Sequence, residues 1–326
     1  MISRQSRREF LKTAGAGAAA AGAVWLFGSR GRRPAQTITQ QTARPNPYVD
    51  EIANRVAVAH YPDPREAVRR AVDALGGIDR FVRQGDVVVV KPNIGWERPP
   101  ELGANTSPEV VAAVVALCVA AGAGMVRVFD RSCNSAEGSY RLSGIPQAAE
   151  DAGARVAIPG AGDYVEMAFT DPRVQALKRW PMNRLALKAD VLINVPVAKH
   201  HGSFTLTMAM KNLMGLMGGD RGRIHTDFHQ KLADLYTGVR PQLSVLDATR
   251  IMLRDGPTTA SRANVRRGVD TVIAGTNAVA VDAYAARRLP WLDGYREANA
   301  EIGYLRVAGA MGLGQDDPDR LQVVEA

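Results

Sequence analysis

Short apolar runs alternate along this chain with longer segments of helical spacing, and this alternation constrains the fold more than any other feature. Four consecutive valines, Val87–Val90, predict a strand that is buried on both faces, because no polar side chain in the run could face solvent. Further apolar runs of strand length are Arg55–His60, Met125–Phe129, Val191–Val197, Leu243–Leu246 and Thr271–Ala274. Strands separated by helices predict an α/β fold, a largely parallel sheet with helices on both faces in a Rossmann-like arrangement.

Capping residues mark the helices between these strands. Ser107 and Pro108 suit the start of a long apolar helix, and Gly122 follows its end. Helical spacing also covers Pro64–Leu75, Gly202–Met217, Thr226–Tyr236 and Asn277–Arg288. These elements predict one α/β domain over residues 51–326, built either as a single lobe or as two lobes that meet near residue 182.

The N-terminal segment, residues 1–34, has the pattern of an export signal. Ser6–Lys12 matches the twin-arginine pattern S-R-R-x-F-L-K at every fixed position, and a weakly apolar, Ala/Gly-rich stretch follows it. We therefore expect the twin-arginine translocon to export the chain to the periplasm or another extracytoplasmic compartment. No A-x-A cleavage site ends the apolar stretch. The leader could therefore be cleaved elsewhere or be retained, and a retained leader would be the chain's contact with the membrane. Residues 35–50, rich in Gln, Thr, Asn and Pro, predict a polar linker.

The formal charge of +8 belongs mainly to this leader. Residues 1–34 hold seven Lys/Arg and one acid, which leaves 34 basic and 32 acidic residues, a net charge of +2, for the rest of the chain. A phosphate-binding surface needs clustered Lys/Arg on the folded domain, and beyond the leader we find only Arg262, Arg266 and Arg267. The charge distribution therefore predicts no nucleic-acid partner.

The chain has two cysteines, Cys118 and Cys133. Two are too few for a disulfide framework, and a cluster that takes four thiolates cannot be built from them. Cys118 lies in the apolar run of the long predicted helix, which favours a buried free thiol over a disulfide. We expect no self-contained iron–sulfur cluster.

The loops after the predicted strands are the candidate site, because ligands of open parallel sheets bind beyond the carboxyl ends of the strands. Lys91 and Asn93 follow the valine run and are suited to hold an anionic or carbonyl group of a substrate. Asp130 and Cys133 follow the next strand and are suited to ligate a metal ion or to position a substrate. Ordinary turn and capping roles are the alternative for both loops.

Four of the five histidines cluster in the second half of the chain: His200, His201, His225 and His229. The last two have the i, i+4 spacing that places both imidazoles on one helix face, a spacing used to clamp a metal ion. Imidazole is the commonest metal ligand and also titrates nearest to neutral pH. The cluster therefore predicts either a transition-metal site, completed by Asp130 or Cys133, or a site of proton transfer.

Two further lysines belong to the candidate site. Lys199 directly precedes the first histidine pair, and Lys211 with Asn212 interrupts the methionine-rich segment Met208–Gly219. Methionines at that spacing are typical of a core, in which a lysine and an asparagine need polar partners. We expect Asn212 to join the first strand-end loop in binding substrate, and Lys199 or Lys211 to act in acid–base chemistry.

Five segments together resemble the domain of unknown function 362 family, in the order of that family: Val87–Trp96, Phe129–Ile145, Lys188–Gly218, Arg223–Leu235 and Gly275–Leu289. The polar positions of the family fall here on Lys91, Asn93, Asp130, Lys199, His200, Lys211, Asn212 and Asp282. The resemblance implies no activity, because the family is named for its lack of an assigned function. Many members carry a ferredoxin-like cysteine module, which the two cysteines of this sequence cannot supply.

A more distant likeness is to the nickel-dependent lactate racemase group. In that group a strand that ends in a histidine is followed by a lysine that carries the nickel pincer cofactor, and then by a further histidine. Here His201 precedes Lys211 by ten residues, and His225 and His229 come later. The likeness is one of arrangement, since Met208–Met210 stands where a small-residue turn would precede the lysine.

Three functions are compatible with these patterns. The first is a metal-binding periplasmic enzyme that acts on a small anionic substrate, with the metal as Lewis acid or activator of water. The second is a non-catalytic accessory protein of a periplasmic redox or assembly system, for which the Trp96–Pro100 loop is a candidate contact surface. The third is a metal-free enzyme with a lysine and a histidine as its acid–base pair. We favour the first on the sequence.

Overall fold

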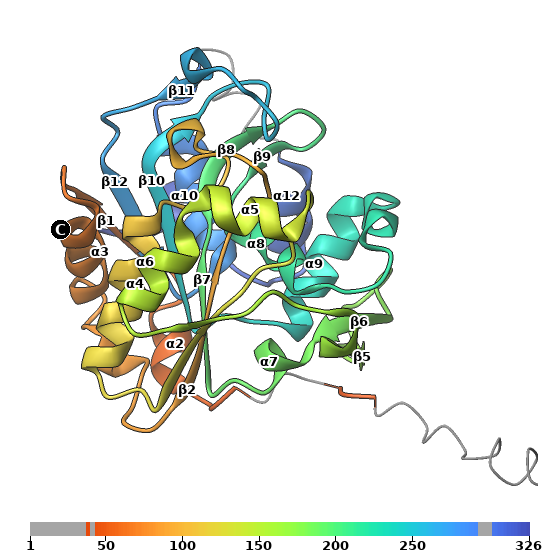
Figure 1. The fold of residues 1–326 in the computed structure, drawn as a ribbon. Coiled ribbons are helices and arrows are strands. Elements are labelled where there is room, and N and C mark those ends of the chain that lie inside the picture. The colour runs from red at the N-terminus through yellow and green to blue at the C-terminus, as the bar shows by residue number, and fades with distance from the viewer. Residues whose placement is uncertain (1–36, 40–42, 293–301) are drawn as a thin grey trace, which may run out of the picture. The chain divides into compact units, whose positions relative to one another are not determined.

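The computed structural model describes residues 37–39, 43–292 and 302–326, and a mixed β-sheet lies at its centre (Figure 1). The strands cross this sheet in the order β13 (Gln322–Glu325), β1 (Arg55–His60), β12 (Thr271–Gly275), β10 (Leu243–Met252), β7 (Val191–Val195), β2 (Val87–Pro92), β3 (Met125–Val128) and β4 (Arg155–Val156). β12 runs antiparallel to both of its neighbours, and the other neighbouring pairs in this order are parallel. The prediction of a largely parallel α/β sheet is confirmed.

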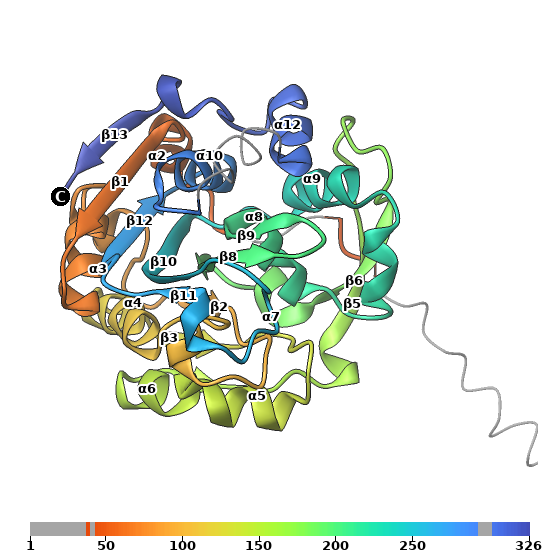
Figure 2. The same ribbon diagram turned by 90° about the horizontal axis from the view of Figure 1, so that it is seen from above.

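The valine run explains why helices cover both faces of this sheet. Val88 and Val90 pack in one apolar cluster with α3 (Pro64–Asp73), α4 (Pro108–Ala120) and α6 (Ile145–Asp151). Val89 packs in the other cluster, with α8 (Ala209–Asn212), α9 (Phe228–Gly238), α10 (Ala278–Arg288) and α12 (Gly303–Ala310). Figure 2 shows α4 and α6 on one side of the sheet and α9 and α12 on the other. Because strand side chains alternate between faces, both faces of β2 are buried.

Shorter elements surround the sheet. The strands β5 (Tyr164–Ala168) and β6 (Arg179–Asn183) form a separate antiparallel ribbon, and β11 (Val265–Arg266) pairs with β10. The remaining α-helices of the described residues are short: α2 (Pro47–Glu51), α5 (Ala136–Ser143) and α7 (Arg184–Leu187).

The predicted helix over Gly202–Met217 is wrong. The predicted strand Val191–Val197 divides into β7 and the start of β8 (Val197–His201), which pairs back with β9 (Thr205–Thr207) as an antiparallel hairpin. The β-branched residues of β9 favour this extended pairing, and Thr205 has a φ of 61°, which interrupts any helical path. Helical structure begins only at α8 and continues as a 3-10 turn over Leu213–Leu216.

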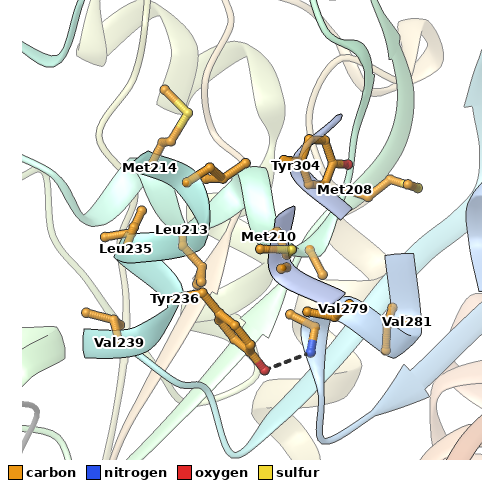
Figure 3. Close-up of a cluster of buried hydrophobic side chains, with 14 of the residues drawn as sticks. Met208, Met210, Leu213, Met214, Leu235, Tyr236, Val239, Val279, Val281 and Tyr304 are labelled. Carbon is orange, nitrogen blue, oxygen red and sulfur yellow. Dashed lines mark hydrogen bonds between the residues drawn. The ribbon is translucent and has the colours of Figure 1, made fainter. Parts of the chain in front are cut away.

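Methionines around α8 face the core, as predicted. Figure 3 shows the buried Met208, Met210 and Met214 beside residues of three other helices. These neighbours are Leu235 and Tyr236 of α9, Val279 of α10 and Tyr304 of α12. The Tyr236 hydroxyl accepts a hydrogen bond of 3.0 Å from the N–H of Ala278 and so ties α9 to the start of α10. Asp282 of α10 accepts hydrogen bonds from the N–H groups of Ala209 (2.6 Å) and Met210 (3.0 Å). These bonds satisfy N–H groups at the start of α8, which lack partners within the helix.

The described part of the predicted linker, residues 35–50, is attached to the domain. Ile38 forms a bridge with Met167, Arg44 makes an ion pair of 2.8 Å with Asp86, and α2 begins at Pro47. Residues 37–326 form one compact unit, and residue 182, the proposed lobe boundary, lies within β6. The predicted leader, residues 1–34, lies outside the described residues. Within the described ranges, no helix is both long and apolar enough to cross a membrane.

Candidate functional site

A cavity of about 290 Å³ lies beyond the carboxyl ends of β2 and β3, the edge of the sheet where the sequence predicted a site. Nine of the eleven residues singled out in the sequence line it: Lys91, Asn93, Asp130, Cys133, Lys199, His201, Lys211, Asn212 and His225. His200 and His229 are not part of its lining.

A buried ion pair forms the floor of this cavity. Lys91 Nζ lies 2.7 Å from Asp130 Oδ1, and the two side chains are 1% and 3% exposed. Burial lowers the pKa of Lys91, and the charge of Asp130 acts in the opposite direction. A Cβ atom on Gly215 would lie 1.8 Å from Asp130 Oδ1, so the pair requires a glycine at that point of the neighbouring 3-10 turn. The charge of Lys91 is therefore balanced by Asp130, and the substrate binding expected of this lysine stays a prediction.

Two asparagines link this ion pair to the second buried lysine. Asn212 Oδ1 accepts hydrogen bonds of 3.0 Å from both Lys91 Nζ and Asn93 Nδ2. Asn93 Oδ1 in turn accepts a hydrogen bond of 3.0 Å from Lys199 Nζ. Asn212 is held from behind by Asn194, whose Oδ1 accepts its Nδ2–H at 2.8 Å. The amides are therefore hydrogen-bonded to the lysines within the cavity lining, and the substrate binding expected of Asn93 and Asn212 stays a prediction.

Lys199 is the lysine whose charge is most affected by its surroundings. Its side chain is 1% exposed, and it donates to the carbonyl of Ala104 as well as to Asn93. Burial, followed by the positive charge of Lys211, lowers the pKa of Lys199 to about 7. A neutral lysine amine has two N–H donors and one lone pair, and these two partners use both donors. The neutral form of Lys199 therefore keeps its lone pair available near neutral pH.

Lys211 projects from α8 toward two aromatic rings. Its Nζ lies 5.6 Å from the ring centre of Phe204 and 5.9 Å from that of Phe228. Burial lowers the pKa of Lys211 to about 8. Its ammonium group makes no hydrogen bond with any described residue, so its donors are available to a ligand.

Arg131 and Arg221 add positive charge that the sequence analysis did not assign to the site. Arg221 donates to Cys133 Sγ at 3.0 Å and to the carbonyl of Arg131 at 2.7 Å. Arg131 donates to the carbonyls of Met217 and Gly219, each at 2.9 Å, and burial lowers the pKa of its guanidinium. The lining thus holds five Lys/Arg side chains and one carboxylate. The cavity is suited to an anion.

The histidine cluster divides into two pairs. His201 and His225 line the cavity, whereas His200 accepts a hydrogen bond from the N–H of Gly256 (3.1 Å) and His229 packs against Gly303 of α12. His225 ends a 3-10 helix, Arg221–His225, and His229 lies in α9. The expectation that both project from one helix face is wrong, because Asp227 between them has a φ of 61°.

The hydrogen bonds of the two cavity histidines assign complementary tautomers. His201 Nδ1 accepts from the N–H of Ser203 at 3.2 Å, so the proton of the neutral ring is on Nε2. Burial and nearby positive charge lower the pKa of His201 to about 3, which keeps the ring neutral. His225 Nδ1 lies 2.9 Å from the carbonyl of Gly222 and must donate to it. His225, when neutral, therefore has an unprotonated Nε2.

The donor groups in the cavity do not fit a metal ion as they are arranged. Within the described ranges, no three His, Cys, Asp or Glu side chains are grouped so that they could hold one. Asp130 is paired with Lys91, and Cys133 receives a hydrogen bond from Arg221. The metal ligand set expected from the sequence therefore does not come together as one group in this arrangement. That set consisted of the four histidines His200, His201, His225 and His229 with Asp130 or Cys133.

Other residues of the cavity carried no sequence signal that pointed to them. Thr207 lies on the unpredicted hairpin, and Arg221 begins the 3-10 helix Arg221–His225, which follows the methionine-rich segment and has no recognisable motif. Trp96 lines the cavity, and Arg98 beside it donates to the carbonyls of Thr258 and Thr259. Of the Trp96–Pro100 loop, the candidate partner surface, Trp96 is the residue that lines this cavity.

Known proteins similar to this chain give a family but no activity. The family model described as "Domain of unknown function (DUF362)" matches residues 88–287. A thylakoid-associated protein from Synechocystis sp. is 30% identical over 199 residues, which are 59% of this chain and 60% of the relative. The chain therefore spans 60% of the length of that curated relative.

A solved structure, the lactate racemase apoprotein from Thermoanaerobacterium thermosaccharolyticum, is also similar. It has a TM-score of 0.44 and 9% sequence identity, over 68% of this chain and 54% of that chain. A likeness of this size supports no statement about the cavity or its chemistry.

Proposed function

The chain belongs to the DUF362 family, and we propose that it is an enzyme that binds a small anionic substrate in the cavity and transfers a proton there. One observation carries this proposal: five Lys/Arg side chains and a single carboxylate line a partly enclosed cavity. One lysine is neutralised by that carboxylate, which leaves four cationic groups without an acidic partner in the lining. An anion would relieve their mutual repulsion.

Lys199 is the proton-transfer group of this proposal. Its pKa of about 7 provides both the neutral and the protonated form near neutral pH, where an acid–base catalyst is most effective. Asn93 and Ala104 hold the amine, which directs its lone pair away from both. A lysine that is buried, oriented and only partly protonated is a candidate catalyst rather than a simple anchor.

Lys211 and His201 would stabilise negative charge on the substrate. Lys211 contributes an ammonium group without a hydrogen-bond partner among the described residues, and His201 contributes a neutral ring with its proton on Nε2. Donors that are already held in place stabilise charge that develops during reaction without reorganising. The step is therefore proton removal by Lys199 from an anion whose charge Lys211 and His201 hold.

This step uses no metal ion, which is a change from the function favoured on the sequence. The anionic substrate is retained from that hypothesis, and the lysine–histidine chemistry comes from the metal-free alternative. The arrangement of donors supports the change, since Asp130 and Cys133 are already engaged with Lys91 and Arg221.

Hydrogen exchange in deuterated water tests the proposal without knowledge of the product. Small carboxylates and phosphate esters with an acidic C–H are incubated with the protein, and proton NMR follows loss of that signal. We expect at least one compound to exchange with the wild type and not with Lys199→Met, while the exposed control Lys188→Met behaves as wild type. Equal exchange by Lys199→Met, or no exchange in any bound compound, would overturn the assignment.

We also propose that the chain is exported by the twin-arginine route. The support is the match of Ser6–Lys12 to the export pattern, since residues 1–34 lie outside the described structure. Replacing both Arg7 and Arg8 by lysine keeps the charge and removes the recognised pair. We expect the wild type in the periplasmic fraction and the double variant in the cytoplasm, and equal distribution would contradict the proposal.

A further inference from the structure

The β8–β9 hairpin places a threonine beside the lysine assigned to proton transfer. Thr207 on β9 is the direct register partner of Lys199 on β8. Side chains that are directly opposite in an antiparallel pair project from the same face of the ribbon. Thr207 and Lys199 therefore both face the cavity, and both are part of its lining.

The hydroxyl of Thr207 lacks a partner although it is buried. The residue is 4% exposed, and Oγ1 makes no hydrogen bond with any described residue. Lys199 does not supply one, because its amine donates to Asn93 and to the carbonyl of Ala104. Buried hydroxyl groups are nearly always hydrogen-bonded, so one that faces a cavity without a protein partner indicates a ligand.

The charge around Thr207 identifies the chemistry of that ligand. Lys199 lies opposite on the hairpin, and Lys211 follows on α8 with no hydrogen bond of its own among the described residues. The ammonium group of Lys211 and the protonated form of Lys199 offer only donors, and a hydroxyl can donate as well. The group that satisfies all three at once is an acceptor with negative charge, which is an oxyanion.

We propose that Thr207 is a ligand-binding residue, and that its hydroxyl donates to a carboxylate or phosphate oxygen held between Lys199 and Lys211. This inference rests on the proposed anion site and adds to it the position of the anionic group. It places that group at the hairpin side of the cavity.

Thr207→Val tests the inference, because valine has nearly the same shape and no hydroxyl. Titration calorimetry of the purified chain with inorganic phosphate and with malonate measures the affinity for each kind of oxyanion. For the probe that binds, we expect the dissociation constant to rise roughly tenfold to a hundredfold in Thr207→Val, since the lost hydrogen bond is to a charged group. Thr207→Ser, which keeps the hydroxyl, should stay near the wild-type value.

Thermal unfolding separates this role from a structural one. If the hydroxyl serves the ligand, Thr207→Val should melt no lower than the wild type without ligand. The matched control is Thr237→Val, because the hydroxyl of Thr237 donates to the carbonyl of Asp234 at 2.7 Å and the residue does not line this cavity. That control should melt at a lower temperature and bind both probes normally.

The outcomes distinguish the inference from the proposed function. Equal affinity of the wild type and Thr207→Val for a bound probe would overturn the role of Thr207 and leave the anion site standing. A lower melting temperature of Thr207→Val without ligand would show a structural hydroxyl and also overturn it. Failure of the wild type to bind either probe would count against the anion site itself, and the inference would fall with it.

Discussion

The ion pair between Lys91 and Asp130 provides a quantitative test of how the cavity is held together. The two side chains are almost completely buried, and their charged atoms lie 2.7 Å apart. Asp130 Oδ1 has Lys91 as its only partner among the described residues. Lys91→Met keeps much of the side chain's volume but leaves this carboxylate oxygen alone in the interior. Removing one member of a buried pair costs roughly 3–5 kcal/mol of unfolding free energy.

The reverse replacement should be less severe. Asp130→Asn leaves a lysine whose pKa is already lowered by burial, so the amine can lose its proton and avoid an unpaired buried charge. The double variant removes both charges together. It should therefore cost less than the sum of the single variants, by on the order of 2–3 kcal/mol.

Urea unfolding followed by circular dichroism measures all three variants, with the slope of the transition as a check that the unfolded state is unchanged. The control cycle replaces Arg288 and Asp319, an ion pair whose side chains are 52% and 69% exposed. That pair should show a coupling of no more than about 1 kcal/mol. Additive costs at Lys91 and Asp130, as small as those of the control, would refute the conclusion that this pair supports the cavity floor.

Three further predictions follow from the same cavity. Sulfate, which does not titrate near neutral pH, should bind with proton uptake and more weakly as the pH rises, because Lys199 and Lys211 lose protons near pH 7 and pH 8. Calorimetry in two buffers of different ionisation enthalpy measures the proton uptake, and proton release on binding would contradict the prediction. Gly215→Ala should cost roughly 3–5 kcal/mol in urea unfolding, because its Cβ would separate the buried pair, and a neutral result would show that the turn can shift instead. Iodoacetamide should modify only Cys133 in the folded protein, because Cys118 is fully buried and its pKa is raised to about 12. Mass spectrometry of native and urea-treated samples identifies the modified cysteine, and modification of Cys118 in the native sample would contradict the prediction.

The sheet could be predicted because its signals are local. A run of β-branched residues such as Val87–Val90 favours a strand with two apolar faces, and Val88–Val90 of β2 pack in the cores on both sides of the sheet. The cap at Asn277 and the apolar face of Ala278–Arg288 likewise fix α10 within a few residues. Each of these elements depends mainly on its own sequence.

The hairpin could not be predicted, because its formation depends on a distant segment. The residues from Gly202 onward have helical spacing, yet β8 pairs with β10, and that pairing extends the chain as far as Lys199. The turn then requires Thr205 in a left-handed conformation, which local preference disfavours. Tertiary pairing therefore outweighs the local pattern, and Lys199 and Thr207 face each other only as a result.

The charge of the site was only partly visible in the sequence, which pointed to Lys91, Lys199 and Lys211 but not to Arg131 and Arg221. Outside the leader the chain is nearly balanced, and no run of basic residues marks a binding surface. The five cations of the cavity come from separate places, at the end of β2, after β3, on β8, on α8 and at the start of a 3-10 helix: Lys91, Arg131, Lys199, Lys211 and Arg221. Clustering of charge is here a property of the fold and not of the composition.

Such a cavity opposes folding, and this cost is the strongest argument that it has a use. Each cation added to a poorly solvated space raises the energy of the others. The protein responds where it can: Lys91 is paired with a carboxylate, and the pKa of Lys199 falls to about 7, so that it carries its charge only part of the time. If the lysines had no other role, apolar residues of similar volume in their place would remove this repulsion more simply. Their presence beside an unpartnered hydroxyl is explained if an anion supplies the missing negative charge, because the repulsion that weakens the free protein then strengthens binding.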